Sequence, residues 1–207
     1  LFLAMIVLML LWTLIRHHQD DSFPDNTFFL IVLPLFLVAK NLLLSDGHFQ
    51  AGASMTMGLF RVAFLVMLER TLTQFMKNAM QATILRNALL DTGIKLLALL
   101  LVVASLLPVA VAAWIGLLLG LLLVGRFVYW KPQLALRRLD IGIMYLGYLA
   151  IVAQLLLQFI DYLVQPGWIG SVPMHVFTFG AMGLIIPAML IRIVNGHTGR
   201  KVVFDRL

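Results

Sequence analysis

MHVFTFGAMGLIIPAMLIRIVNGHTGR, from Met174 to Arg200, is the stretch that decides the fold. Between Met174 and Val194 the one charged side chain is Arg192, close to the end of the run. At about 1.5 Å per residue, a helix over this range is roughly 31 Å long, which matches the hydrocarbon core of a bilayer. The stretch therefore predicts a transmembrane helix that ends near Gly196, a residue type common just past a helix C-terminus.

The composition extends this interpretation to the whole chain. Hydrophobic residues make up 62% of the 207 residues and charged residues 12%, whereas soluble domains have about 45–50% and about 25%. We therefore expect a single all-α domain, residues 1–207, that forms a polytopic transmembrane helix bundle in a lipid bilayer. The net charge of +6 does not indicate nucleic-acid binding, because the basic residues fall at the ends of apolar runs. The absence of cysteine excludes disulfides, thiol chemistry and Cys-ligated metals.

Apolar runs along the chain predict about seven spans, the first of them partial. Between the third and fourth spans we expect a basic connector over residues 69–86, in which Leu72, Phe75, Met76 and Ala79 share one helix face. The predicted spans are residues 1–15, 28–45, 52–68, 88–106, 109–128, 141–163 and 174–194.

The run from residue 96 to 124 has no charge and holds Pro108 near its middle. One helix over this run would measure about 43 Å, too long for a bilayer without strong tilt, whereas two helices that turn at Pro108 fit. Basic clusters lie on both sides of the run, and the positive-inside rule places both on one face, which requires an even number of spans between them. We therefore predict two helices here, and the same sorting of Lys and Arg predicts a cytoplasmic C-terminus.

The chain opens with LFLAMIVLML, without an initiator Met or a basic segment before the apolar run. A secretory signal peptide has such a basic segment, so we expect instead that the sequence starts inside a span and that an N-terminal half is missing. That half, or a second copy of the chain, is the partner we expect besides the bilayer.

Four charged residues inside the predicted spans are candidates for function, because charge is costly in a membrane. Lys40 lies about 8 Å from the outer end of its span, where it either reaches the headgroups or lines a path for a solute. Arg61 lies about half-way across, so it faces the bundle interior, a water-filled cavity or an anionic ligand. Asp91 and Lys95 are spaced i, i+4, so we expect them to neutralise each other on one helix face.

Histidine is the natural haem or copper ligand in a chain without cysteine. His48 and His175 lie at the predicted outer face, where they are able to converge on one metal. His197 cannot join them, because about 33 Å of continuous helix separates it from His175. The alternative for His175 is an interfacial histidine bonded to water.

His197 lies between Gly196 and the sequence Thr198-Gly199-Arg200, which predicts a tight turn after the last helix. Such a turn, with its basic residue, suits an anion such as a lipid phosphate or a haem propionate. The alternative is a helix stop followed by a basic membrane anchor.

Motifs of soluble enzymes do not occur in this sequence. It has no P-loop, no dinucleotide-binding fingerprint, no H-E-x-x-H and no G-x-S-x-G. No catalytic residue is therefore predicted, and the sequence leaves open whether the protein is an enzyme.

The segments MHVFTFGAMG and RIVNGHTGR resemble the C-terminal signature of the NnrS family, and LERTLTQFMKNAM and YWKP with IMYLGYL resemble it more weakly. The resemblance implies a multi-pass protein of the bacterial inner membrane, linked to the response to nitric oxide and nitrosative stress, with haem and copper as cofactors. It points to His175 and to His197 with its neighbours Gly196, Thr198, Gly199 and Arg200.

The sequence also departs from the family pattern. The family has a histidine where this chain has Tyr145, and its N-terminal His-rich motif does not occur in these 207 residues. Family members are about twice as long, so this chain alone need hold neither haem nor copper. Two alternatives stay open: a transporter or permease-like bundle for a small anionic solute, with Lys40 and Arg61 along its path, and a metal-free homologue with a structural role.

Overall fold

The computed structural model describes residues 2–17, 24–84 and 86–199, and these residues form helices and short connections without a strand. An apolar helix satisfies every backbone polar group within the segment, as a bilayer requires. The elements in chain order are α1 (Phe2–Arg16), the 3₁₀ helix η1 (Pro24–Phe28), α2 (Phe29–Leu43), α3 (Phe49–Met80), α4 (Ala88–Ala104), α5 (Val109–Tyr129), α6 (Pro132–Ala135), α7 (Leu139–Val164), α8 (Val172–His175), the π-helix η2 (Val176–Met182) and α9 (Gly183–His197).

The prediction of an all-α transmembrane bundle is confirmed. Within the described residues, five helical segments are long and apolar enough to cross a membrane, whereas the predicted count of about seven is not confirmed. α1 has 15 residues and α4 has 17, so both fall short in length. The five segments are Asn26–Leu43, Phe49–Met80, Val109–Tyr129, Leu139–Val164 and Val172–His197.

The long apolar run breaks at Pro108, as predicted. α4 ends at Ala104, and Pro108 directly precedes the first residue of α5. The hydroxyl of Ser105 donates to the carbonyl of Val102 at 2.7 Å, which satisfies an acceptor at the open end of α4. The two helices then run antiparallel and pack against each other.

The expected third span and basic connector, residues 52–68 and 69–86, are wrong as separate segments. α3 is one helix of 32 residues, about 48 Å long. It continues because Leu72 and Met76 are fully buried and extend the apolar face of the span, with Phe75 and Ala79 packed beside them, so the predicted shared face is confirmed. The helix ends where Gln81 adopts a left-handed conformation.

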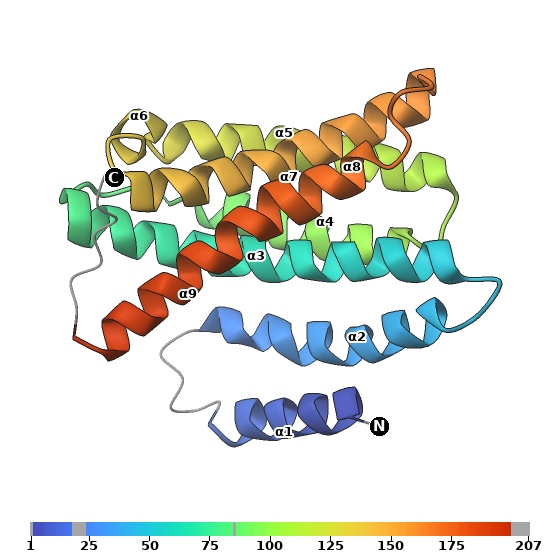
Figure 1. Cartoon of the computed structure of the whole chain (residues 1–207), viewed down its shortest axis with the longest axis horizontal. Helices are drawn as coiled ribbons and strands as arrows, with labels where there is room; N and C mark the ends of the chain where they lie inside the picture. The colour runs from blue at the N-terminus through green and yellow to red at the C-terminus, as the bar shows by residue number, and fades with distance from the viewer. Residues whose placement is uncertain (1, 18–23, 85, 200–207) are drawn as a thin grey trace.

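The helices cross the bundle in alternating directions. Figure 1 shows the C-terminal ends of α1, α3, α5 and α9 at one end, and those of α2, α4 and α7 at the other. Apart from Lys40 and Arg61, the described basic residues gather towards the first end, and the turns at the second end, residues 44–48, 105–108 and 165–171, contain no Lys or Arg. This sorting is the one that the positive-inside rule requires.

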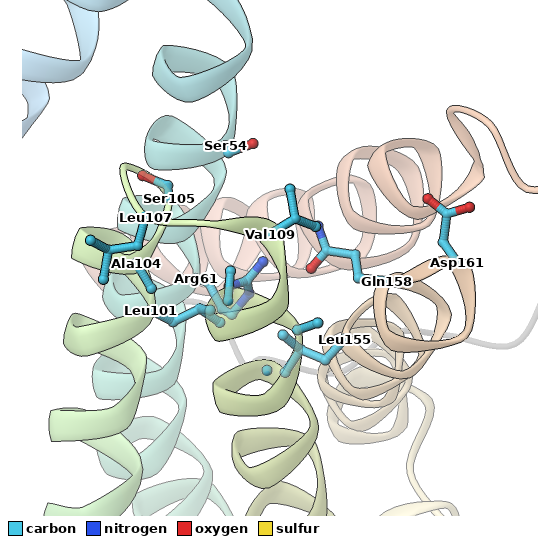
Figure 2. A pocket seen from close by; sticks show the side chains of 13 residues that line it. Ser54, Arg61, Leu101, Ala104, Ser105, Leu107, Val109, Leu155, Gln158 and Asp161 are labelled. Carbon is cyan, nitrogen blue, oxygen red and sulfur yellow. The ribbon is translucent and has the colours of Figure 1, made fainter. Parts of the chain in front are cut away.

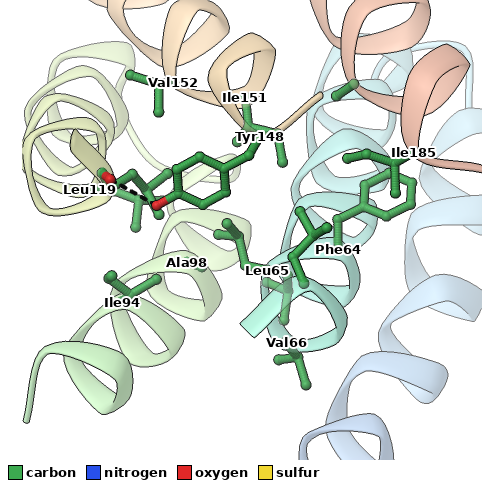
Figure 3. Close-up of a cluster of buried hydrophobic side chains, with 14 of the residues drawn as sticks. Phe64, Leu65, Val66, Ile94, Ala98, Leu119, Tyr148, Ile151, Val152 and Ile185 are labelled. Carbon is green, nitrogen blue, oxygen red and sulfur yellow. Dashed lines mark hydrogen bonds between the residues drawn. The ribbon is translucent and has the colours of Figure 1, made fainter. Parts of the chain in front are cut away.

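α3 and α7 form the centre of the bundle. α3 packs against α2, α4 and α7, and α7 packs against α5, η2 and α9. Buried side chains of these helices and of α4 and α5 form one hydrophobic core around them (Figure 3). Among them are Leu65, Ile94, Leu119, Tyr148 and Ile151. Polar groups carried on the inner faces of α3 and α7 therefore meet inside the bundle.

Candidate functional site

The three candidate histidines lie at the ends of helices and are exposed. His48 precedes α3, and its Nδ1 lies 3.3 Å from the hydroxyl of Ser45. His175 ends α8, with its ring centroid 5.8 Å from that of Phe179. His197 is the last residue of α9.

His175 and His197 cannot share a metal. α8, η2 and α9 follow one another without a break from Val172 to His197, which puts the two imidazoles at opposite ends of one span. Across residues 2–17, 24–84 and 86–199, no group of three or more His, Asp or Glu side chains is arranged to hold a metal ion. Haem takes only one or two axial ligands, so the lack of such a group does not bear on it, and the ligand roles of the histidines stay predictions.

The turn after α9 has the expected form. The hydroxyl of Thr198 donates to the carbonyl of Val194 at 2.8 Å, and Gly199 has a φ of +67°, a conformation that glycine adopts without strain. Gly196 belongs to the last turn of α9. Arg200, the anion-binding candidate of this turn, lies outside the described residues.

The signature segment MHVFTFGAMG contains the π-helix η2. The backbone N–H of Gly183 donates to the carbonyl of Thr178, five residues earlier. π-Helical turns are rare and frequently mark functional sites. Here the wider turn lies close to α7, and small residues allow this approach. A Cβ on Gly180 would lie only 2.8 Å from the Cβ of Ala150.

Arg61 is a buried cation at the α3–α7 contact, with 3% of its surface exposed. Its Nη2 donates to Oε1 of Gln154 at 2.9 Å, and its guanidinium lies 5.8 Å from the ring of Phe177. Its Nε and the Nε2 of Gln154 have no hydrogen-bond partner. Arg61 therefore lies in the bundle interior, which is one of the possibilities that the sequence left open.

A cavity of about 230 Å³ lies beside Arg61, between α3, α4, α5 and α7. Figure 2 shows Arg61 among the ends of α4 and α5, with Gln158 and Asp161 on the α7 side. Lys40, which the sequence placed on the same path, is half-buried on α2 and does not line the cavity.

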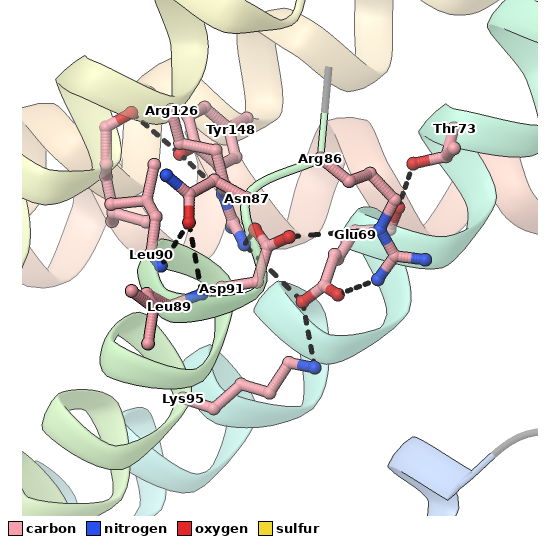
Figure 4. Close-up of polar contacts among 11 residues, drawn as sticks. Glu69, Thr73, Arg86, Asn87, Leu89, Leu90, Asp91, Lys95, Arg126 and Tyr148 are labelled. Carbon is pink, nitrogen blue, oxygen red and sulfur yellow. Dashed lines mark hydrogen bonds and ion pairs between the residues drawn. The ribbon is translucent and has the colours of Figure 1, made fainter. Parts of the chain in front are cut away.

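A second polar region, the ion cluster, consists of Glu69, Arg86, Asp91, Lys95 and Arg126 where α3, α4 and α5 meet (Figure 4). Lys95 Nζ lies 3.1 Å from Glu69 Oε2, and Arg86 pairs with the other oxygen of the same carboxylate. Arg126 Nη1 lies 3.7 Å from Glu69 Oε2 and 3.6 Å from Asp91 Oδ1. Lys95 is thus paired with Glu69, and Asp91 with Arg126 and Arg86, so both residues belong to a larger set that joins three helices. Their direct pairing with each other stays a prediction.

Aromatic residues cover Arg126 on its other side. Its guanidinium lies 4.6 Å from the ring of Trp130 and 5.4 Å from that of Tyr148. Its Nε donates to Tyr148 Oη at 3.3 Å, and that hydroxyl donates to the carbonyl of Leu123 at 2.8 Å. The cation is thereby buried inside the bundle, with 1% of its surface exposed.

A third polar contact joins the start of α7 to α9. Arg192 Nη2 donates to Asp140 Oδ2 at 2.6 Å, and Arg138 donates to both oxygens of the same carboxylate at 3.0 and 2.9 Å. The guanidinium of Arg192 also lies 3.8 Å from the ring centroid of Phe75. This contact fixes the basic end of the last helix against α3 and α7.

Sequence reasoning missed several of these residues. Glu69 was assigned to a connector, Gln154 and Gln158 were not singled out, and Asp161 was expected only at the interface that ends its span. The spacing i, i+4, i+7 of the last three on α7 puts them on one helix face and could have revealed a polar stripe inside an apolar span.

Comparison with known proteins identifies one family. The family model described as "NnrS protein" matches residues 1–207. No curated protein and no solved structure matches the chain.

Proposed function

Because the chain belongs to the NnrS family, we propose that it acts in the response to nitric oxide and nitrosative stress, as a multi-pass protein of the bacterial inner membrane. The observation that carries this proposal is the match of the family model over the whole chain. Five candidate spans and the basic residues gathered at one end support insertion with a cytoplasmic C-terminus.

Haem and copper are the cofactors that the resemblance implies. We propose that they bind when this chain is joined by a second copy or by a further segment of the protein. His175 is exposed, and its imidazole nitrogens have no hydrogen-bond partner in the part of the chain that the structure describes, so it is free to act as one ligand. One imidazole does not make a site. The other ligands would come from a second copy or from a further segment of the protein.

The test is protection of cells against nitric oxide. A bacterium whose own gene is deleted is complemented with the wild-type gene or with His175→Ala, and growth is followed after addition of a nitric oxide donor. We expect the wild-type gene to restore growth and His175→Ala to fail at equal membrane abundance. His17→Ala, at an exposed histidine just after α1 that the resemblance does not point to, is the matched control and should protect as the wild type does. Equal protection by His175→Ala would remove this residue from the proposal.

A second function, transport of a small anionic solute, is favoured by the buried Arg61 beside its cavity. The corresponding test is uptake of a labelled anion into proteoliposomes. Uptake should depend on Arg61 and not on Lys40, which lies away from the cavity. Uptake that is lost in Lys40→Gln and kept in Arg61→Gln would contradict this path.

A further inference from the structure

Arg61 has no acidic partner, although it is almost completely buried. Its guanidinium contacts the neutral amide oxygen of Gln154 and the ring of Phe177, and no carboxylate pairs with it within the described residues. From this geometry we propose that the cavity beside Arg61 is a binding site for one small inorganic monoanion. The inference is independent of the nitric oxide proposal and supplies the binding site that the transport alternative requires.

The first support is electrostatic. An ion withdrawn from water is costly unless an opposite charge and hydrogen bonds compensate it. Arg61 has one hydrogen bond, and its Nε is left without a partner. The ion cluster differs, because its three basic side chains face the carboxylates of Glu69 and Asp91. An anion in the cavity would give Arg61 the compensation that those cations already have.

The second support is a polar path from the mouth of the cavity to Arg61. Ser54 and Arg61 are seven residues apart on α3, and Gln158 and Asp161 line the cavity from α7. Seven residues of helix correspond to about 10 Å, so Ser54 lies near the α4–α5 turn and Arg61 lies deep. A hydrated anion entering at the turn would exchange water for the hydroxyl of Ser54 and the amide of Gln158 before it reaches Arg61.

Size and charge define the ligand class. A volume of about 230 Å³ is below the range of about 300–1,000 Å³ that is typical of drug-sized ligands. A guanidinium presents its N–H groups in a plane that matches an oxyanion. The carboxylate of Asp161 at the lining repels a dianion more strongly than a monoanion. A planar monoanion such as nitrate is therefore a suitable probe, and sulfate is a suitable competitor control.

The experiment is calorimetric titration of the purified full chain in lipid nanodiscs with sodium nitrate, at constant ionic strength kept with sodium gluconate. We expect saturable one-to-one binding that sulfate does not compete. Arg61→Gln should weaken binding at least about tenfold, as loss of a charge-assisted hydrogen bond predicts. Asp161→Asn should tighten it at least about twofold, because the substitution removes a like charge from the lining of the cavity.

A second pair of variants keeps the test decisive if Arg61→Gln does not fold. Ala112→Phe puts a ring into the cavity from α5, and Leu118→Phe puts a ring on the exposed side of the same helix. Binding should be lost in Ala112→Phe and kept in Leu118→Phe. The proposal is overturned if nitrate does not bind the wild type, or if Ala112→Phe or Arg61→Gln binds it as the wild type does. Binding without uptake into proteoliposomes would remove the transport alternative and leave the binding site standing.

Discussion

Glu69 on α3 and Lys95 on α4 form a buried ion pair, with 3.1 Å between Oε2 and Nζ and with 2% and 7% of the two side chains exposed. The sequence did not predict this contact, because Glu69 was assigned to a basic connector outside the predicted spans. The pair joins two central helices, and the rest of the ion cluster surrounds it (Figure 4).

Glu69→Gln should destabilise the protein by about 3 kcal/mol or more, because removing one partner leaves buried charge uncompensated. The ion cluster holds three basic and two acidic side chains, a net charge of 3 − 2 = +1. The substitution raises this to +2, and the double variant Glu69→Gln/Lys95→Met restores +1. Unfolding in detergent should therefore show the double variant to be more stable than the sum of the two single variants predicts. Additive losses would mean that the pair contributes no coupling energy.

Gly147→Ala should destabilise the contact between α7 and α9 by about 1–3 kcal/mol, because of overpacking. A Cβ at Gly147 would lie 2.5 Å from Cγ1 of Ile185, a side chain that is fully buried and has no space to yield. The matched control is Gly125→Ala on α5, where a Cβ meets nothing within 4 Å. This control should be neutral or slightly stabilising, since alanine favours a helix. Equal unfolding midpoints for the two variants would contradict the close packing.

Tyr148→Phe should cost more stability than Tyr145→Phe, although both remove one buried hydroxyl. The hydroxyl of Tyr148 accepts from Arg126 and donates to Leu123, whereas that of Tyr145 donates to the carbonyl of Trp130 at 2.7 Å. Loss of a hydrogen bond to a charged group costs about 1.5–3 kcal/mol, against about 0.5–1.5 for a neutral one. Thermal unfolding of the two variants in the same detergent measures the difference, and a reversed order would show that Arg126 does not depend on this hydroxyl.

Single cysteines should report the membrane orientation directly, because the natural chain has none. The test introduces Gln133→Cys in α6 and Thr198→Cys after α9, both at the basic end of the bundle. Gly167→Cys is introduced in the turn at the other end. A maleimide that does not cross the membrane should label Gly167→Cys in whole spheroplasts, and the other two only after lysis. Labelling of Gln133→Cys and Thr198→Cys from opposite sides would contradict the arrangement of α5, α7 and α9.

Most of the apolar helices followed from the sequence, because transfer from water to lipid depends on each segment's own side chains. The break at Pro108 and the buried face of Leu72 and Met76 were predicted for this reason. The continuation of α3 through Glu69 was not predicted, since a buried glutamate is tolerated there only when Lys95 and the arginines of the ion cluster surround it.

The sequence by itself therefore determined that this is a multi-pass helical membrane protein with its basic residues at one end. Only the tertiary structure decided which charges meet and which do not. Arg61 and Gln154 are 93 residues apart, yet their side chains bond at 2.9 Å beside a cavity, because the rotation of α3 about its axis turns this arginine towards α7. Hydropathy sets how deep a residue lies along the membrane normal, and side-chain packing between helices sets which partner it faces.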